Sequence, residues 1–245
     1  MDLAFVLVES ARYPAPESII AAGAELGVDM QLSSFEREGP MCFSLSNGAE
    51  VMYMLMPAPH PDAPKMLGPL SPSPAEVARA KAHYVVTALR LDGEVEDRDL
   101  QMAALTAVLV DASPDAIGAM LGHGALFQKA KLFSELTALG VREGMLPPEV
   151  AIDLTAAAEP GDRMSFLTHG MTRYGREELY VTCPVRGRGA LDFVLSMTRW
   201  LYTDRDKRLP TGDTVGRSAD EKIIVQRVPS PTGTGPNVIR LDLSS

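Results

Sequence analysis

The chain is poor in cysteine and in aromatic residues, and it has no long apolar run. Cys42 and Cys183 are its only cysteines, so a disulfide framework is excluded and a reducing compartment such as the cytosol fits best. The longest apolar runs are too short to cross a bilayer. The first residues include an acid but no basic region or cleavage site, which argues against a signal peptide. We therefore expect a cytoplasmic protein that does not associate with a membrane.

Basic residues are also scarce. The 23 Lys and Arg against 32 Asp and Glu give a net charge of −9, which argues against nucleic acid as a partner. The deficit is uneven: residues 1–172 carry 11 basic and 23 acidic side chains, whereas residues 173–227 carry 11 and 8. The acidic N-terminal portion would suit a basic partner. The basic segment could attract an anion, or its arginines could simply solvate the surface.

The hydrophobic pattern predicts an α+β protein, a two-layer sandwich of a mixed, mostly antiparallel sheet with helices. We expect one globular domain over residues 1–245, in which 1–95 and 96–245 would form two related α/β halves. Predicted strands lie near 3–8, 41–46, 49–56, 83–91, 150–155, 164–168, 178–183, 223–227 and 238–243. Predicted helices lie near 16–26, with Pro16 in the first turn and Gly27 as the stop, after Ser73, from about 97 to before Pro114, at 129–139 before Gly140, and at 190–202. The last of these is apolar enough to be packed on several sides.

The clearest local signal is a hairpin across Asn47-Gly48, because this pair supplies the positive φ angles of a two-residue turn. Such a turn places Phe43 opposite Met52 and fixes the remaining register. The residues gathered on one face, which we interpret as a core face, are Met41, Phe43, Leu45, Met52, Met54 and Met56.

Residues 57–74, here called the proline-rich loop, contain seven prolines. Proline cannot join a strand ladder or a helix interior, so this segment is predicted to be an extended surface loop. Loops of this length without regular structure are typically functional covers or linkers. The pattern Ser73-Pro74-Ala75-Glu76 at its end predicts a capping box and a short helix.

The segment 169–178, here called the polar turn, is the best candidate for a site. The side chains it gathers are His169, Arg173, Tyr174, Glu177 and Glu178. Arg173 could grip a carboxylate or phosphate through two hydrogen bonds. His169 could move a proton while Glu177 or Glu178 holds its tautomer. The interpretations are a ligand or partner site, acid–base catalysis, or a structural strand connection whose glycines serve backbone geometry.

Two other turns are weaker candidates. Asp213 and Thr214 could cap a turn through the Asp side chain, bind a cation or meet the basic groups of the polar turn. One carboxylate makes a poor Mg²⁺ or Ca²⁺ site. Residues 187–189, Gly-Arg-Gly before a helix, resemble a phosphate-binding turn but lack the Lys-Ser/Thr of a P-loop. The histidine and cysteine spacings match no transition-metal motif, so we expect no metal and no cofactor.

Three segments form a more specific pattern together than any does alone: Ala80–Val86, which contains His83, then Gly170–Glu178, then Gly212–Gly216. In this order and spacing the chain resembles domain of unknown function 4261, a bacterial family of stand-alone cytosolic proteins. The resemblance spans most of residues 55–228. That family has no established activity, so the resemblance implies a cytosolic location and a single scaffold for the three segments, and no mechanism.

We therefore expect a cytosolic binding or adaptor protein without catalysis of its own, since no complete set of nucleophile, base and oxyanion donors is present. A protein partner, such as a toxin or a secretion or assembly component, is favoured over a metabolite. The proline-rich loop and the polar turn would form the recognition surface. The alternative is a small hydrolase or transferase in which His169 and Glu178 exchange protons and Arg173 anchors an anion. It requires Asp213 and His83 to join them in one pocket.

Overall fold

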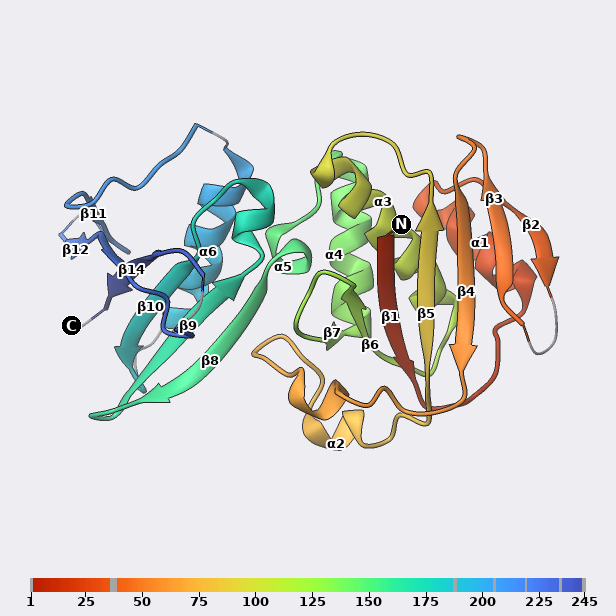
Figure 1. Ribbon diagram of the computed structural model, residues 1–245, viewed down its shortest axis with the longest axis horizontal. Coiled ribbons are helices and arrows are strands. Elements are labelled where there is room, and N and C mark those ends of the chain that lie inside the picture. The colour runs from red at the N-terminus through yellow and green to blue at the C-terminus, as the bar shows by residue number, and fades with distance from the viewer. Residues whose placement is uncertain are drawn as a thin grey trace. The chain divides into compact units, whose positions relative to one another are not determined.

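A computed structural model describes residues 2–35, 39–186, 189–204, 206–218, 220–233 and 235–243. The chain divides into two compact units, unit 1 (Met1–Ala151) and unit 2 (Ile152–Ser245). Each has its own sheet and helices, and the strand pairs are mostly antiparallel, so the predicted α+β class is confirmed (Figure 1). The division lies at 151/152, whereas the halves expected from the sequence would meet at 95/96. Among the described residues, no helix is long and apolar enough to cross a membrane.

Unit 1 is built on a seven-stranded antiparallel sheet of order β2-β3-β4-β5-β1-β6-β7. Its strands are β1 (Asp2–Val8), β2 (Met30–Phe35), β3 (Met41–Leu45), β4 (Glu50–Met56), β5 (Ala82–Leu89), β6 (Ala116–Leu121) and β7 (Gln128–Lys129). Its helices are α1 (Pro16–Leu26), α2 (Pro74–Val77), α3 (Val95–Ala112), α4 (Ala130–Glu143), α5 (Pro148–Ala151) and the 3-10 helix η1 (Ala63–Lys65). Pro16 opens α1 and Gly27, with a φ of 78°, ends it, as predicted.

Helices α1, α3 and α4 cover one face of this sheet (Figure 1). Tyr53 points toward them, because its hydroxyl donates to the Leu105 carbonyl of α3 at 2.9 Å. Met41 and Val86 pair with Tyr53 across the sheet, share its face and are fully buried like it. Burial raises the pKa of the Tyr53 phenol, so this hydroxyl stays protonated and donating. The helix-covered face is the main core of unit 1.

The proline-rich loop covers part of the opposite face. Ala4 pairs with Val86 on the helix-covered face, so the alternate residues Phe5 and Leu7 point the other way. Leu7 belongs there to a small apolar cluster that includes loop residues and α2. The buried members of this cluster are Leu7, Ala63, Val77, Ala80, Ile117, Met120 and Phe127. The loop is thus packed onto the sheet through a core of its own.

The β3–β4 hairpin differs by one residue from the predicted register. Leu45 N donates to Ala49 O at 2.9 Å, so the turn contains three residues and not two. Gly48, with a φ of 85°, is the left-handed residue that such a bulged turn requires. Phe43 consequently pairs with Val51 and not with Met52. The β4 residues buried on the core face are Val51 and Tyr53, so the predicted Met52, Met54 and Met56 were wrong.

Of the other predictions for unit 1, one helix cap is confirmed, two strands were missed and one helix is longer than expected. The capping box of Ser73 and Glu76 is present before α2. Strands β2 and β6 were not predicted, because β2 buries one residue and β6 nearly all of its residues. Helix α4 continues past Gly140, its predicted end, to a left-handed Gly144. A Cβ at Gly140 would lie 2.5 Å from Pro147 Cδ, so this glycine permits the close approach of the next segment.

Unit 2 contains a five-stranded sheet of order β13-β14-β10-β9-β8 and a two-stranded ribbon, β11-β12. Its elements are β8 (Asp153–Glu159), β9 (Arg163–His169), the 3-10 helix η2 (Met171–Tyr174), β10 (Leu179–Pro184), α6 (Ala190–Thr203), β11 (Thr214–Val215), β12 (Ile223–Ile224), β13 (Gln226–Val228) and β14 (Val238–Asp242). Strands β10 and β14 run parallel, and the other pairs are antiparallel. The two sheets differ in strand number and order, and a relation between the two halves of the chain stays a prediction.

Helix α6 buries one face and leaves the other open. Its buried residues, spaced by three and four, are Ala190, Phe193, Val194, Thr198, Leu201 and Tyr202. Trp200 is 37% exposed, and Lys207 Nζ lies 5.0 Å from the centre of its ring. The expectation that this helix is packed on several sides was therefore wrong.

Candidate functional site

The polar turn of unit 2 is anchored by two buried side chains. Met171 and Tyr174 of η2 point into the unit, and the Tyr174 ring meets the Tyr202 ring edge-on at 5.0 Å. Gly170 and Gly175 flank η2 with φ angles of 113° and 70°, which side chains with a Cβ rarely adopt. Tyr174 is therefore a packing residue and does not present its ring to a ligand.

The carboxylate of Glu178 organises this turn. Glu178 Oε2 accepts a 2.7 Å hydrogen bond from Thr168 Oγ1, and Oε1 accepts from Gly170 N at 2.9 Å and Thr172 N at 3.3 Å. Thr168 Oγ1 in turn accepts from Leu179 N at 2.8 Å. Both oxygens are thus engaged by the backbone and hydroxyl groups that shape the turn. This arrangement fits a structural carboxylate better than a proton carrier.

Glu177 links the polar turn to the turn before β11. Its carboxylate accepts two hydrogen bonds from Arg227, at 2.8 and 2.7 Å, and Arg227 Nη1 also donates to Thr211 Oγ1 at 2.8 Å. The hydrogen bonds that Arg227 donates to Glu177 raise the pKa of the Arg227 guanidinium. Arg227 was not among the predicted site residues, and one sequence carries no signal that singles it out. The polar turn and the turn before β11 are thus linked through Arg227 of β13, and a contact of Asp213 or Thr214 with the basic groups of the polar turn stays a prediction.

His169, at the end of β9, contacts a hydroxyl and not a carboxylate. Its Nε2 lies 2.9 Å from Thr155 Oγ1 on β8. Burial lowers the pKa of His169, and the nearby charge of Glu178 opposes this shift only in part. Among the described residues, no hydrogen bond joins His169 to Glu178. The proposed His–Glu proton pair therefore lacks a direct hydrogen bond.

Arg173, Asp213 and Thr214 are the exposed members of the predicted set. Asp213 contributes its backbone, since Val225 N donates to Asp213 O at 2.8 Å, and Thr214 begins the β11–β12 ribbon. Glycine is required at position 216, because a Cβ there would lie only 2.2 Å from the carbonyl oxygen of Glu221. The Asp213 and Thr214 side chains are therefore exposed on the turn that Gly216 shapes.

His83, the remaining predicted residue, belongs to unit 1. It is buried on β5, its Nδ1 lies 2.8 Å from the Ala58 carbonyl oxygen, and its ring lies 5.1 Å from that of His60. The His60 ring also meets Phe127 edge-on at 5.4 Å. Burial lowers the pKa of His60, His83 lowers it further, and Asp62 opposes the shift. This histidine pair fastens the proline-rich loop to the sheet.

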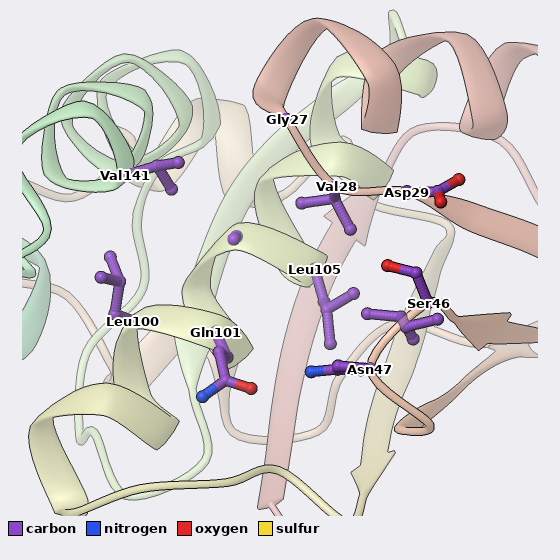
Figure 2. A pocket seen from close by; sticks show the side chains of 11 residues that line it. Gly27, Val28, Asp29, Ser46, Asn47, Leu100, Gln101, Leu105 and Val141 are labelled. Atoms are coloured by element: carbon purple, nitrogen blue, oxygen red, sulfur yellow. The ribbon is translucent and has the colours of Figure 1, made fainter.

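A cavity of about 260 Å³ lies in unit 1 where α1 ends, the β3–β4 turn closes and α3 passes (Figure 2). The residues that line it are Gly27, Val28, Asp29, Leu45, Ser46, Asn47, Leu100, Gln101, Ala104, Leu105 and Val141. Aliphatic side chains form most of its wall, and the amides of Asn47 and Gln101 point toward each other in Figure 2. Asp29, which is exposed, is the acidic residue at its rim. Gly27 and Asn47 are each recognisable in the sequence as turn residues, whereas their proximity in the fold is not.

A second hollow, of about 730 Å³, lies in unit 2 between the open face of α6 and the β11 segment. Met197, Trp200 and Arg217 line it, and Arg217 is held by an ion pair with Glu221. Gly189 also lines it as the left-handed residue before α6, whereas residues 187 and 188 of the predicted phosphate-binding turn lie outside the described residues. In the part of the chain that the structure describes, no cluster of three or more His, Cys, Asp or Glu side chains could hold a metal ion.

No family model, no curated protein and no solved structure matches the chain. The resemblance to domain of unknown function 4261 stays a prediction. The candidate sites are therefore a mostly aliphatic cavity with Asp29 at its rim in unit 1, and a polar turn in unit 2 whose Glu178 carboxylate bonds to the turn's own groups.

Proposed function

We propose that the chain is a non-catalytic binding protein of a reducing, cytoplasmic compartment, and that it recognises a basic protein partner through unit 1. The cavity with Asp29 at its rim carries the proposal. Its aliphatic wall would receive an apolar side chain, and the carboxylate would meet a positive charge at the mouth. Helix α1 ends at this mouth, and the carbonyl end of a helix also favours positive charge.

The charge distribution supports a basic partner. Unit 1 carries 10 basic and 20 acidic side chains, whereas unit 2 carries 13 and 12. Unit 1, which holds the cavity, is thus strongly negative at −10, whereas unit 2 is close to neutral at +1. Such a field would speed the approach of a positively charged surface and weaken with added salt.

The size of the cavity supports a protein side chain over a metabolite. Pockets for drug-sized ligands run from roughly 300 to 1,000 Å³, and this cavity is smaller. The alternative of a hydrolase or transferase at His169, Glu178 and Arg173 gains no support from the geometry, because Glu178 is already engaged four ways by its own turn.

Partner capture with matched variants tests the proposal. Ala104→Leu would fill the cavity, and Asp29→Lys would reverse the charge at its rim. Glu17→Lys makes the same charge change at the other end of α1 and serves as the control. We expect wild type and Glu17→Lys to retain one partner that elutes with salt, and the two cavity variants to bind the purified partner at least tenfold more weakly. Equal retention by all four proteins, each with a normal thermal unfolding curve, would refute the proposal.

A further inference from the structure

The sheet of unit 1 has one open edge, at β2. This strand ends the strand order, and the five residues that follow Met30 in it are all exposed. Asp29 O accepts from Ser46 N at 3.3 Å on the inner side. Because successive backbone groups of a strand alternate in direction, the N–H and C=O groups of Met30 and Leu32 point to the outer side. Among the described residues, no backbone group bonds to that side.

The opposite edge is closed by the chain itself. Phe127 N donates to Met66 O at 2.9 Å, and Lys129 N donates to Leu70 O at 3.1 Å. Both acceptors belong to the proline-rich loop, whose prolines have no N–H to offer a further strand. Over the described residues, the β7 edge thus receives backbone bonds from the proline-rich loop and the β2 edge receives none.

The side chains of β2 do not protect it from pairing. Exposed edges are commonly blunted by lysine, proline or inward-pointing charge, and the sequence Met-Gln-Leu-Ser-Ser-Phe contains none of these. Leu32 and Phe35 are each 42% exposed, and the Phe35 ring meets the Tyr13 ring at 5.5 Å. The irregularity in pairing with β3 after Leu32 limits how far a regular added strand could extend along this edge.

We propose that an extended, basic segment of a partner protein adds to β2 as a further strand. This inference rests on the proposed function and specifies how that partner is held. Main-chain hydrogen bonds to the outward groups of Met30 and Leu32 would supply affinity, and the exposed Leu32 and Phe35 would select alternate apolar side chains. Glu25 and Asp29 stand just before the strand, so basic residues in the segment are favoured there. A second copy of unit 1 would bring like charge to this edge.

A defined peptide tests the inference directly. The probe is an end-blocked, fluorescein-labelled octapeptide of alternating lysine and valine, and binding to the full chain is followed by anisotropy. One comparison peptide carries N-methyl groups on alternate residues, and another replaces lysine with glutamate. We expect both to bind at least tenfold more weakly than the probe. We also expect the amide hydrogens of Met30 and Leu32 to exchange more slowly when the probe is bound. Equal binding of the N-methylated peptide would overturn the inference.

Variants of β2 provide a second measurement. Leu32→Pro removes an outward N–H without removing an inner ladder bond, and Leu32→Val keeps that N–H and serves as the matched control. We expect Leu32→Pro to lose probe binding at least tenfold and Leu32→Val to retain it. If Leu32→Pro folds normally and retains binding, or if the chain alone forms dimers protected at Met30 and Leu32, the inference is wrong. The proposed function stands even then, provided that Asp29→Lys and Ala104→Leu still lose the partner.

Discussion

The Glu178 carboxylate accepts hydrogen bonds from groups before and within the polar turn. It accepts from the Thr168 hydroxyl before the turn and from the Gly170 and Thr172 amides within it. Without it, these donors would have to find water in a partly buried setting. A charged acceptor with several neutral donors is among the stronger hydrogen-bonding arrangements in proteins. We therefore expect this side chain to contribute to stability more than its partly exposed position suggests.

Glu178→Ala should lower the free energy of unfolding by about 2 kcal/mol, because it removes a charged acceptor from several donors. Glu178→Gln should cost about half as much, since one amide oxygen can still accept. Urea denaturation measures both. Glu177→Ala is the control: it breaks the ion pair with Arg227, which is about a third exposed, and should cost less than about 1 kcal/mol. Equal costs at the two positions would contradict the role assigned to Glu178.

His169 should make the stability of unit 2 dependent on pH. Burial lowers its pKa below the ordinary 6.5, so the folded state binds fewer protons than the unfolded state once the pH falls below about 6.5. The free energy of unfolding should therefore fall as the pH drops through 6.5 and level off below the folded pKa. Histidine ring resonances in NMR should report a midpoint below 6.5, and His169→Gln should flatten the stability curve. A midpoint above 6.5 would contradict the burial argument.

At the scale of elements, the β3–β4 hairpin shows how one residue in a turn decides a whole strand face. Asn47-Gly48 is compatible with a two-residue turn and with the three-residue turn observed. A change from a two-residue to a three-residue turn shifts the pairing by one residue. Because side chains alternate along a strand, this shift exchanges the buried and half-exposed faces of β4. Val51 and Tyr53 fill the core and Tyr53 reaches α3, a contact that the local pattern does not contain.

Gly48 offers a test of this turn. Gly48→Ala should destabilise the chain by about 1 kcal/mol, because a Cβ disfavours a φ of 85°. No atom lies within 4 Å of the position such a Cβ would take, so the cost is one of backbone conformation alone. Gly48→Asn, a residue that tolerates this conformation, should recover part of the loss. Thermal unfolding of the three proteins checks the order, and an alanine variant as stable as wild type would contradict it.

The sequence predicted most of the helices and strands but few of the contacts between them. Caps and stops such as Pro16, Gly27 and the Ser73 box are local, and they are confirmed. Strands β2 and β6 lack alternation, because one is almost entirely exposed and the other almost entirely buried. The polar turn was located correctly as a segment, whereas its Arg227 partner comes from a strand fifty residues away in the sequence. Long-range pairings of this kind leave no periodic trace in one sequence.

At the scale of the whole molecule, the two units differ in charge and in architecture. The sheet and helices of unit 1 are complete within residues 1–151, and those of unit 2 within residues 152–245. We therefore expect residues 1–151 to fold as an independent fragment with a cooperative thermal transition. Circular dichroism and a melting curve of this fragment measure it. An unfolded fragment would contradict the independence of unit 1, and residues 152–245 provide the companion measurement.

The unequal edges of the unit 1 sheet set a limit on assembly. A sheet that is open on both sides can propagate strand by strand into a polymer, whereas one that is closed at β7 has a single place for addition. Association through β2 would be self-limiting, with a stoichiometry of one added strand per chain. Because the proline-rich loop occupies the β7 edge, association through β2 could not be repeated at that edge, and we expect no strand-by-strand polymer.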